Sequence, residues 1–143
     1  CMQEMQPMLY FKKERIMAYL HTMIRVKDAE ASLKFYIGLF GMKLDSMKKL
    51  NDCWLYFLAD ENGTPVLELT ENDVIPPEGY SLGTAFGHLA FGVKSMDEFT
   101  EKMKSLGHEY LYEPFDLTGR GSNIAFLKDP DGYEIEVIEK VNW

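Results

Sequence analysis

The sequence contains an internal repeat in which a histidine, a helix pattern and an acidic residue recur in the same order. His21 opens one apolar stretch, and Glu68 follows it by 47 positions. His88 opens a second stretch of similar build, and Glu136 follows it by 48 positions. Each copy buries little apolar surface alone, so the two must pair through their sheets. The repeat therefore predicts a duplicated fold.

In the first copy, residues 20–26 alternate in polarity, which predicts a strand with His21, Met23 and Arg25 on one face. Asp28 is a good N-cap for the helix that follows, and Gly41 is placed to end it. Further strands are predicted at 42–46, 53–59 and 64–70, the last two joined by an Asn-Gly turn at 60–63.

The second copy repeats this order after residue 83. The strand that contains His88 leads to a helix with capping-box spacing at 95–98. Its predicted buried stripe is Met96, Phe99, Met103 and Leu106. Strands are then predicted at 109–114, 123–127 and 133–139, and the last places Glu136 on the same face as Glu134 and Ile138.

These elements predict an α+β fold of two βαβββ modules. Residues 1–16 are interpreted as an N-terminal extension, 17–75 as the first module, 76–83 as a linker rich in Pro and Gly, and 84–143 as the second module. The two modules together form one domain over 17–143, a size typical of a single domain.

Composition excludes several classes of function. The net charge of −8 argues against a nucleic-acid partner, which requires a basic patch. The apolar runs are too short to span a bilayer, so no membrane association is expected. Cys1 and Cys53 form no disulfide framework and favour free thiols in a reducing cytoplasm, although Cys1 is also compatible with a processed or added N-terminus.

Four residues at equivalent places in the repeat favour a metal site. A lone histidine in a strand is usually structural, and a glutamate flanked by leucines usually lies on a solvent face. However, His21, Glu68, His88 and Glu136 occur at matching positions in two copies, and imidazole with carboxylate suits a divalent metal. The third histidine, His108, follows a turn glycine and is assigned to the surface.

Four motifs together resemble glyoxalase I, the lactoylglutathione lyase family of the vicinal-oxygen-chelate superfamily. They occur in family order and are LHTMIRV at 20–26, VLELT at 66–70, GTAFGHLA at 83–90 and DPDGYEIE at 129–136. The resemblance covers about 18–140. It implies paired βαβββ modules that form a U-shaped, mostly antiparallel sheet around a metal, the glyoxalase/bleomycin-resistance-like fold.

The family's metal ligands fall on the four residues that the repeat selects. The resemblance implies isomerisation of the methylglyoxal–glutathione hemithioacetal to S-lactoylglutathione, a 2-oxoaldehyde detoxification that passes through an enediolate. Glu136 is then the main base and Glu68 a ligand and second base. The short, bacterial-like loops favour nickel or cobalt, with zinc or manganese as alternatives.

The resemblance also implies residues that hold the thiol carrier. Arg25 and Asn72 occupy the places that contact glutathione in the family, and Arg25 shares the strand face of His21. The arginine found in animal members before the second histidine is replaced by Thr84, and Arg120 is predicted to substitute for another missing basic residue. Another low-molecular-weight thiol therefore stays an alternative.

The resemblance implies a homodimer with active sites between subunits, and a single chain closing on itself is the alternative. Two further readings stay open. One is a different metalloenzyme of the superfamily: a thiol transferase, an epimerase or a ring-cleaving dioxygenase. The other is a metal-free small-molecule binding protein. The complete set of four ligands, Glu68 in particular, favours the isomerase over both.

Overall fold

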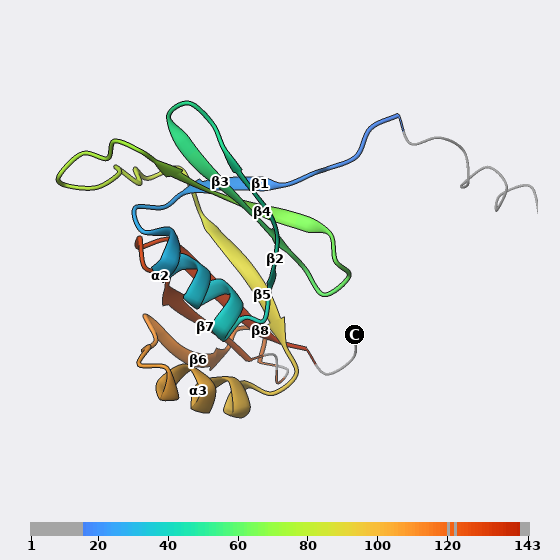
Figure 1. Cartoon of the computed structure of the whole chain (residues 1–143). Helices are drawn as coiled ribbons and strands as arrows, with labels where there is room; N and C mark the ends of the chain where they lie inside the picture. Colours follow the sequence, from blue (N-terminus) through green and yellow to red (C-terminus); the bar gives the residue numbers. More distant parts are fainter. Residues whose placement is uncertain (1–15, 120, 122, 141–143) are drawn as a thin grey trace, which may run out of the picture.

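The computed structural model describes residues 16–119, 121 and 123–140 (Figure 1). The elements in chain order are β1 (Thr22–Arg25), α2 (Ala29–Leu33), the π-helix η1 (Lys34–Leu39), β2 (Lys43–Lys49), β3 (Cys53–Ala59), β4 (Pro65–Asn72), β5 (His88–Val93), α3 (Met96–Ser105), β6 (Tyr112–Asp116), β7 (Asn123–Lys128) and β8 (Glu134–Glu139). No helix among these residues is long and apolar enough to cross a membrane.

The strands form two four-stranded sheets of identical topology, in the orders β1-β4-β3-β2 and β5-β8-β7-β6. In each sheet the first strand pairs in parallel with the last, and the other two pairings are antiparallel. The predicted α+β fold of two mostly antiparallel βαβββ modules is therefore confirmed. The exact boundaries proposed for the extension, modules and linker stay a prediction.

Both helices begin at the capping residues that the sequence indicates, and the first ends at the expected glycine. The Asp28 carboxylate accepts a hydrogen bond from the Ala31 N–H (3.3 Å), and the Ser95 hydroxyl accepts one from the Glu98 N–H (3.1 Å). Gly41 follows the first helix with φ 72°, a conformation that glycine adopts without strain. The widening of that first helix into the π-helix η1 has no signal in the sequence pattern.

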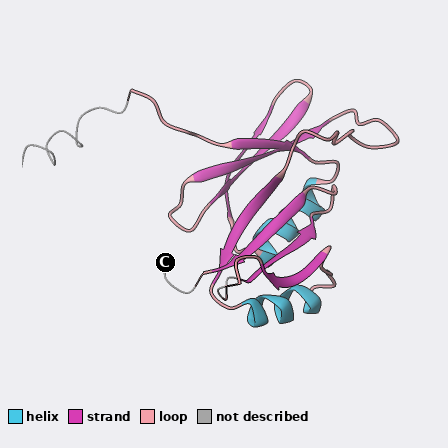
Figure 2. Cartoon of the chain, turned by 180° about the vertical axis from the view of Figure 1, so that it is seen from behind, coloured by secondary structure: helices cyan, strands magenta, loops and turns pink. Residues whose placement is uncertain are grey.

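One hydrophobic core contains side chains from both modules, and Figure 2 shows the sheets and helices of both from behind. Figure 1 shows α2 between the two sheets, and the Phe40 ring at the end of η1 stacks on Phe91 of β5 with centroids 4.1 Å apart. One sequence expectation is wrong here: Leu106 is 50% exposed, because α3 ends at Ser105. His108, expected at the surface, is half-buried with its ring edge-on to Phe35.

A buried hydrogen bond also joins the modules. The Tyr36 hydroxyl of η1 donates to Asp129 Oδ2 in the turn between β7 and β8 (2.6 Å), and Asp129 Oδ1 accepts from the backbone N–H groups of Asp131 and Tyr133. Burial raises the pKa of Tyr36 above its ordinary value, and the adjacent Asp129 carboxylate raises it further. Burial likewise raises the pKa of Asp129, although the Tyr36 hydrogen bond opposes this shift.

We expect Tyr36→Phe to lower the free energy of unfolding by roughly 1–3 kcal/mol, because Asp129 Oδ2 loses the hydroxyl that satisfies it in a buried place. Urea denaturation measures the change. Tyr112→Phe is the matched control, since Tyr112 is exposed and its substitution should change the stability by less than about 0.5 kcal/mol. Equal unfolding midpoints for both variants would contradict the assigned role of the Tyr36–Asp129 bond.

Candidate metal centre

The first module brings His21 and Glu68 together. Glu68 lies on β4 in parallel register with Met23 of β1, and His21 precedes Met23 by two residues, so both candidate ligands lie on one face of the sheet. His21 Nε2 lies 3.4 Å from Glu68 Oε1. The opposite face carries the buried Ile24 and Leu69, which fixes the direction of the two polar side chains.

The second module repeats this arrangement with His88 and Glu136. Ala90 of β5 registers with Glu136 of β8, and His88 precedes Ala90 by two residues, as His21 precedes Met23. His88 Nε2 lies 3.7 Å from Glu136 Oε1. The histidine–glutamate pairing predicted from the repeat therefore occurs in both modules with the same strand register.

An aromatic ring packs against the histidine of each pair, a contact that the sequence did not predict. Phe57 registers with Glu68 across β3 and β4, and the His21 ring meets the Phe57 ring edge-on with centroids 5.7 Å apart. Phe126 registers with Glu136 across β7 and β8, and the His88 and Phe126 centroids are 5.6 Å apart. A phenylalanine 11 or 10 positions before each glutamate is the signal that would have found them.

The chain does not bring the two pairs to each other. Over residues 16–119, 121 and 123–140, no three His, Cys, Asp or Glu side chains lie close enough to share a metal ion. Each pair nevertheless presents one imidazole nitrogen beside one carboxylate oxygen, which are donors that divalent metals prefer. The donor set thus fits a divalent metal, and each module supplies half of it.

Two of the three residues predicted to bind substrate lie within the described part of the chain. Arg25 is exposed on the face of His21 and registers with Thr70, while Asn72 lies two residues further along β4 on the same face. Two tyrosine hydroxyls form hydrogen bonds with the backbone of these two residues. The Tyr133 hydroxyl donates to the Arg25 carbonyl (2.9 Å), and the Tyr80 hydroxyl accepts from the Asn72 N–H (3.2 Å). Arg120 lies outside the described residues.

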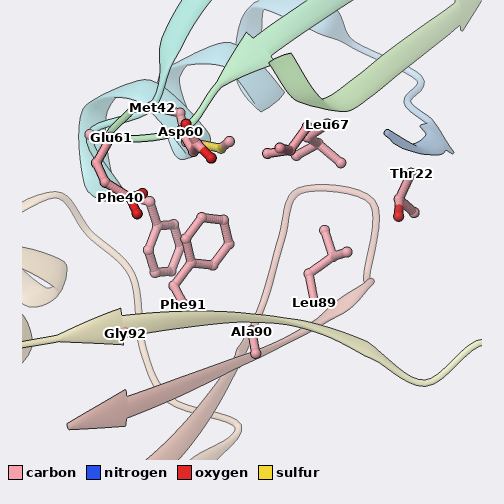
Figure 3. Close-up of a pocket in the computed structure, with 12 residues that line it drawn as sticks. Thr22, Phe40, Met42, Asp60, Glu61, Leu67, Leu89, Ala90, Phe91 and Gly92 are labelled. Carbon is pink, nitrogen blue, oxygen red and sulfur yellow. The ribbon is translucent and has the colours of Figure 1, made fainter. Parts of the chain in front are cut away.

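A cavity of about 460 Å³ lies between the two sheets. Figure 3 shows the stacked Phe40 and Phe91 rings along one side, with Asp60 and Glu61 near Met42. None of His21, Glu68, His88 and Glu136 lines it. A smaller cavity of about 290 Å³ is lined by Arg25 and Tyr80, among others, at the end of the sheet that holds the predicted substrate residues.

Comparison with known proteins places this geometry in a family. Residues 18–137 match the family model described as Glyoxalase/Bleomycin resistance protein/Dioxygenase superfamily. The chain belongs to this superfamily. A probable lactoylglutathione lyase of Vibrio parahaemolyticus is 42% identical to this glyoxalase-family chain, covering 84% of it and 88% of the relative. The lactoylglutathione lyase of Escherichia coli O157:H7 is 40% identical over 87% of the chain and 93% of the relative.

Longer relatives and solved structures agree with this family. The lactoylglutathione lyase GLX1 of Arabidopsis thaliana is 35% identical, and the chain spans only 50% of its length. The structure of glyoxalase I from Zea mays has a TM-score of 0.77 at 34% identity, covering 87% of this chain and 45% of that one. The trypanothione-dependent glyoxalase I of Leishmania major has a TM-score of 0.70 at 37% identity, covering 86% of both chains.

Proposed function

We propose that the chain is a metal-dependent lactoylglutathione lyase that converts the methylglyoxal–glutathione hemithioacetal into S-lactoylglutathione. The observation that carries the proposal is the matched pair of His–Glu contacts, at 3.4 and 3.7 Å, on equivalent strands of two modules. Bacterial relatives about 40% identical over most of their length bear the name of this enzyme. A metal-free binding protein has no need of four metal-competent side chains at repeated positions.

His21, Glu68, His88 and Glu136 would hold the divalent metal, with nickel or cobalt favoured and zinc or manganese as alternatives. Such a metal supplies positive charge that stabilises the negative oxygens of the enediolate. The preference for nickel or cobalt follows from the short loops that resemble bacterial members. The two imidazoles and two carboxylates suit all four metals, so the choice among them is part of the proposal.

The protein's own part in the chemistry is to move one proton between neighbouring carbons. The Glu136 carboxylate takes the proton from the hydroxyl-bearing carbon and returns it to the adjacent carbonyl carbon. The hydroxyl proton passes to the former carbonyl oxygen, so a thioester carbonyl forms as the ketone is reduced to a hydroxyl, and substrate and product contain the same atoms. Glu68 acts as a ligand and second base. The Phe57 and Phe126 rings beside the histidines limit the orientations of both imidazoles.

Arg25 and Asn72 would bind the charged end of the thiol carrier. The exposed Arg25 guanidinium has a fork of donors that suits a carboxylate, and Asn72 lies on the same face of the sheet. Arg120 is the third proposed contact. The carrier is glutathione or another low-molecular-weight thiol, and the relative from Leishmania major is described as trypanothione-dependent.

A homodimer would complete the site. Each chain offers one His–Glu pair on each of two separate sheets, and among the described residues the two pairs do not meet. A two-fold pairing that joins the first module of one chain to the second module of its partner creates two identical four-ligand sites. We propose this arrangement in place of a single chain that closes on itself, and a cytoplasmic location stays a prediction.

Metal reconstitution tests the proposal. Protein stripped with a chelator should form no thioester from methylglyoxal and glutathione, and one of Ni, Co, Mn or Zn should restore formation with one metal per chain. Thioester formation should stop without metal and return with it, because the carboxylates and imidazoles alone supply no Lewis acid. Metal bound at that stoichiometry without thioester formation by any of the four would contradict the proposed reaction while leaving the ligand set in place.

A further inference from the structure

The two His–Glu pairs agree in register, distance and aromatic support but differ at one neighbouring position. Thr70 lies two residues after Glu68 on β4, and its hydroxyl donates a hydrogen bond to Glu68 Oε2 (2.8 Å). The equivalent position in the second module, two residues after Glu136 on β8, is Ile138. Isoleucine has no hydrogen-bond donor in its side chain. The internal repeat therefore has a built-in asymmetry beside its two carboxylates.

Thr70 is well placed to hold its neighbour. It is only 5% exposed, and it lies on the central strand β4 between Arg25 of β1 and Leu55 of β3. A β-branched side chain has few rotamers, and a buried hydroxyl does not exchange its partner freely with water. With Oε2 held by Thr70 and Oε1 facing His21, both oxygens of Glu68 have a fixed neighbour.

Glu136 has no such constraint. Within the described part of the chain, its one side-chain polar contact is with His88, at 3.7 Å. Its second oxygen receives no hydrogen bond from those residues, and its neighbour on the strand is an apolar side chain. A carboxylate held on one side only is free to rotate about its side-chain bonds, which a group that carries a proton between two carbons requires.

We propose that Thr70 is a positioning residue that fixes Glu68 as a ligand, and that its absence beside Glu136 leaves Glu136 free to act as the base. This inference rests on the proposed function for the roles of the two glutamates. Outer hydrogen-bond partners of metal ligands typically change metal affinity or activity by about 10–100-fold when they are removed. The difference between Thr70 and Ile138 thus gives two otherwise equivalent carboxylates different roles, Glu68 as a ligand and Glu136 as the base.

The first test compares Thr70→Val, which keeps the shape but removes the donor, with Thr70→Ser, which keeps the donor. Metal dissociation constants for Zn and Ni are measured by chelator competition, beside kcat, KM and the unfolding midpoint of the metal-free protein. We expect Thr70→Val to weaken metal binding about tenfold, while Thr70→Ser stays near the wild type. If Thr70→Val binds metal as the wild type does, Thr70 does not position Glu68 and the inference is wrong.

The second test adds the missing hydroxyl to the other module. Ile138→Thr should lower kcat without weakening metal binding, because a donor beside Glu136 restrains the base. Ile138→Val controls for the lost volume and should retain kcat. An unchanged kcat in Ile138→Thr would overturn the division of roles. If the wild type binds metal and Thr70→Val weakens it, but no variant forms thioester, the proposed reaction fails while the positioning role stands.

Discussion

Glu136→Gln is expected to lower kcat for thioester formation by about a thousandfold, within the range for removal of a general base. The amide is nearly isosteric with the carboxylate and keeps an oxygen to face the metal, but it cannot accept the proton. Because the loss concerns the chemical step, KM should change much less than kcat. Steady-state kinetics with the methylglyoxal–glutathione hemithioacetal, at saturating metal, measure both parameters.

Metal content separates this effect from loss of the site. Glu136→Gln should still bind metal, whereas Glu68→Gln should lose affinity, since the Thr70 hydroxyl that donates to Glu68 suits a carboxylate rather than an amide nitrogen. Glu101→Gln on the exposed face of α3 makes the same chemical change far from the ligands and should leave kcat unaltered. Near-normal turnover by metal-loaded Glu136→Gln would show that another group is the base.

The sequence predicted the parts of this structure that depend on local patterns. Strand parity placed Met23 and Arg25 on one face, and the structure has both exposed there while Ile24 and Val26 of the other face are buried. The repeat spacing paired each histidine with the correct glutamate, because strand register and element order are conserved between the two copies. Caps at Asp28 and Ser95 fixed where both helices begin.

Features that depend on contacts between elements were not predicted. The edge-on Phe57 and Phe126 rings come from a strand remote from each histidine, so no local periodicity reveals them. The strand expected at 109–114 is instead β6 at Tyr112–Asp116, since its pairing with β7 rather than its own composition sets its ends. The separation of the two His–Glu pairs within one chain depends on how whole modules pack, and only the family resemblance, not any local pattern, implied sites between subunits.

Because the two His–Glu pairs lie apart within one chain, a second large effect is expected when two inactive variants are mixed. His21→Ala and Glu136→Gln should each have almost no activity alone. Mixed as denatured chains and refolded together, they should recover about a quarter of wild-type activity, if two-fold dimers form at random. Half of the dimers are then mixed, and in each of these one site combines two damaged modules while the other combines two intact ones.

The matched control mixes His21→Ala with Glu68→Gln, which damage the same module. Every site of that mixed dimer takes its first module from a chain that carries one of the two changes, so no intact site forms and activity should not return. Native mass spectrometry of chains with different tags confirms that mixed dimers are present in both samples. The second change is a glutamate-to-glutamine substitution in both mixtures, in the second module of one and the first module of the other, and saturating metal in both assays compensates for the weaker affinity expected of Glu68→Gln.

The contrast between the mixtures decides how the four ligands meet. If a single chain closed on itself, each chain would keep its own damaged site, and neither mixture would recover. Such closure would also have to move the modules relative to each other, although the Phe40–Phe91 stack and the Tyr36–Asp129 hydrogen bond hold them in one continuous core. Breaking those contacts exposes packed aromatic rings and leaves a buried carboxylate unsatisfied, whereas the proposed dimer would keep the contacts and bring intact half-sites together.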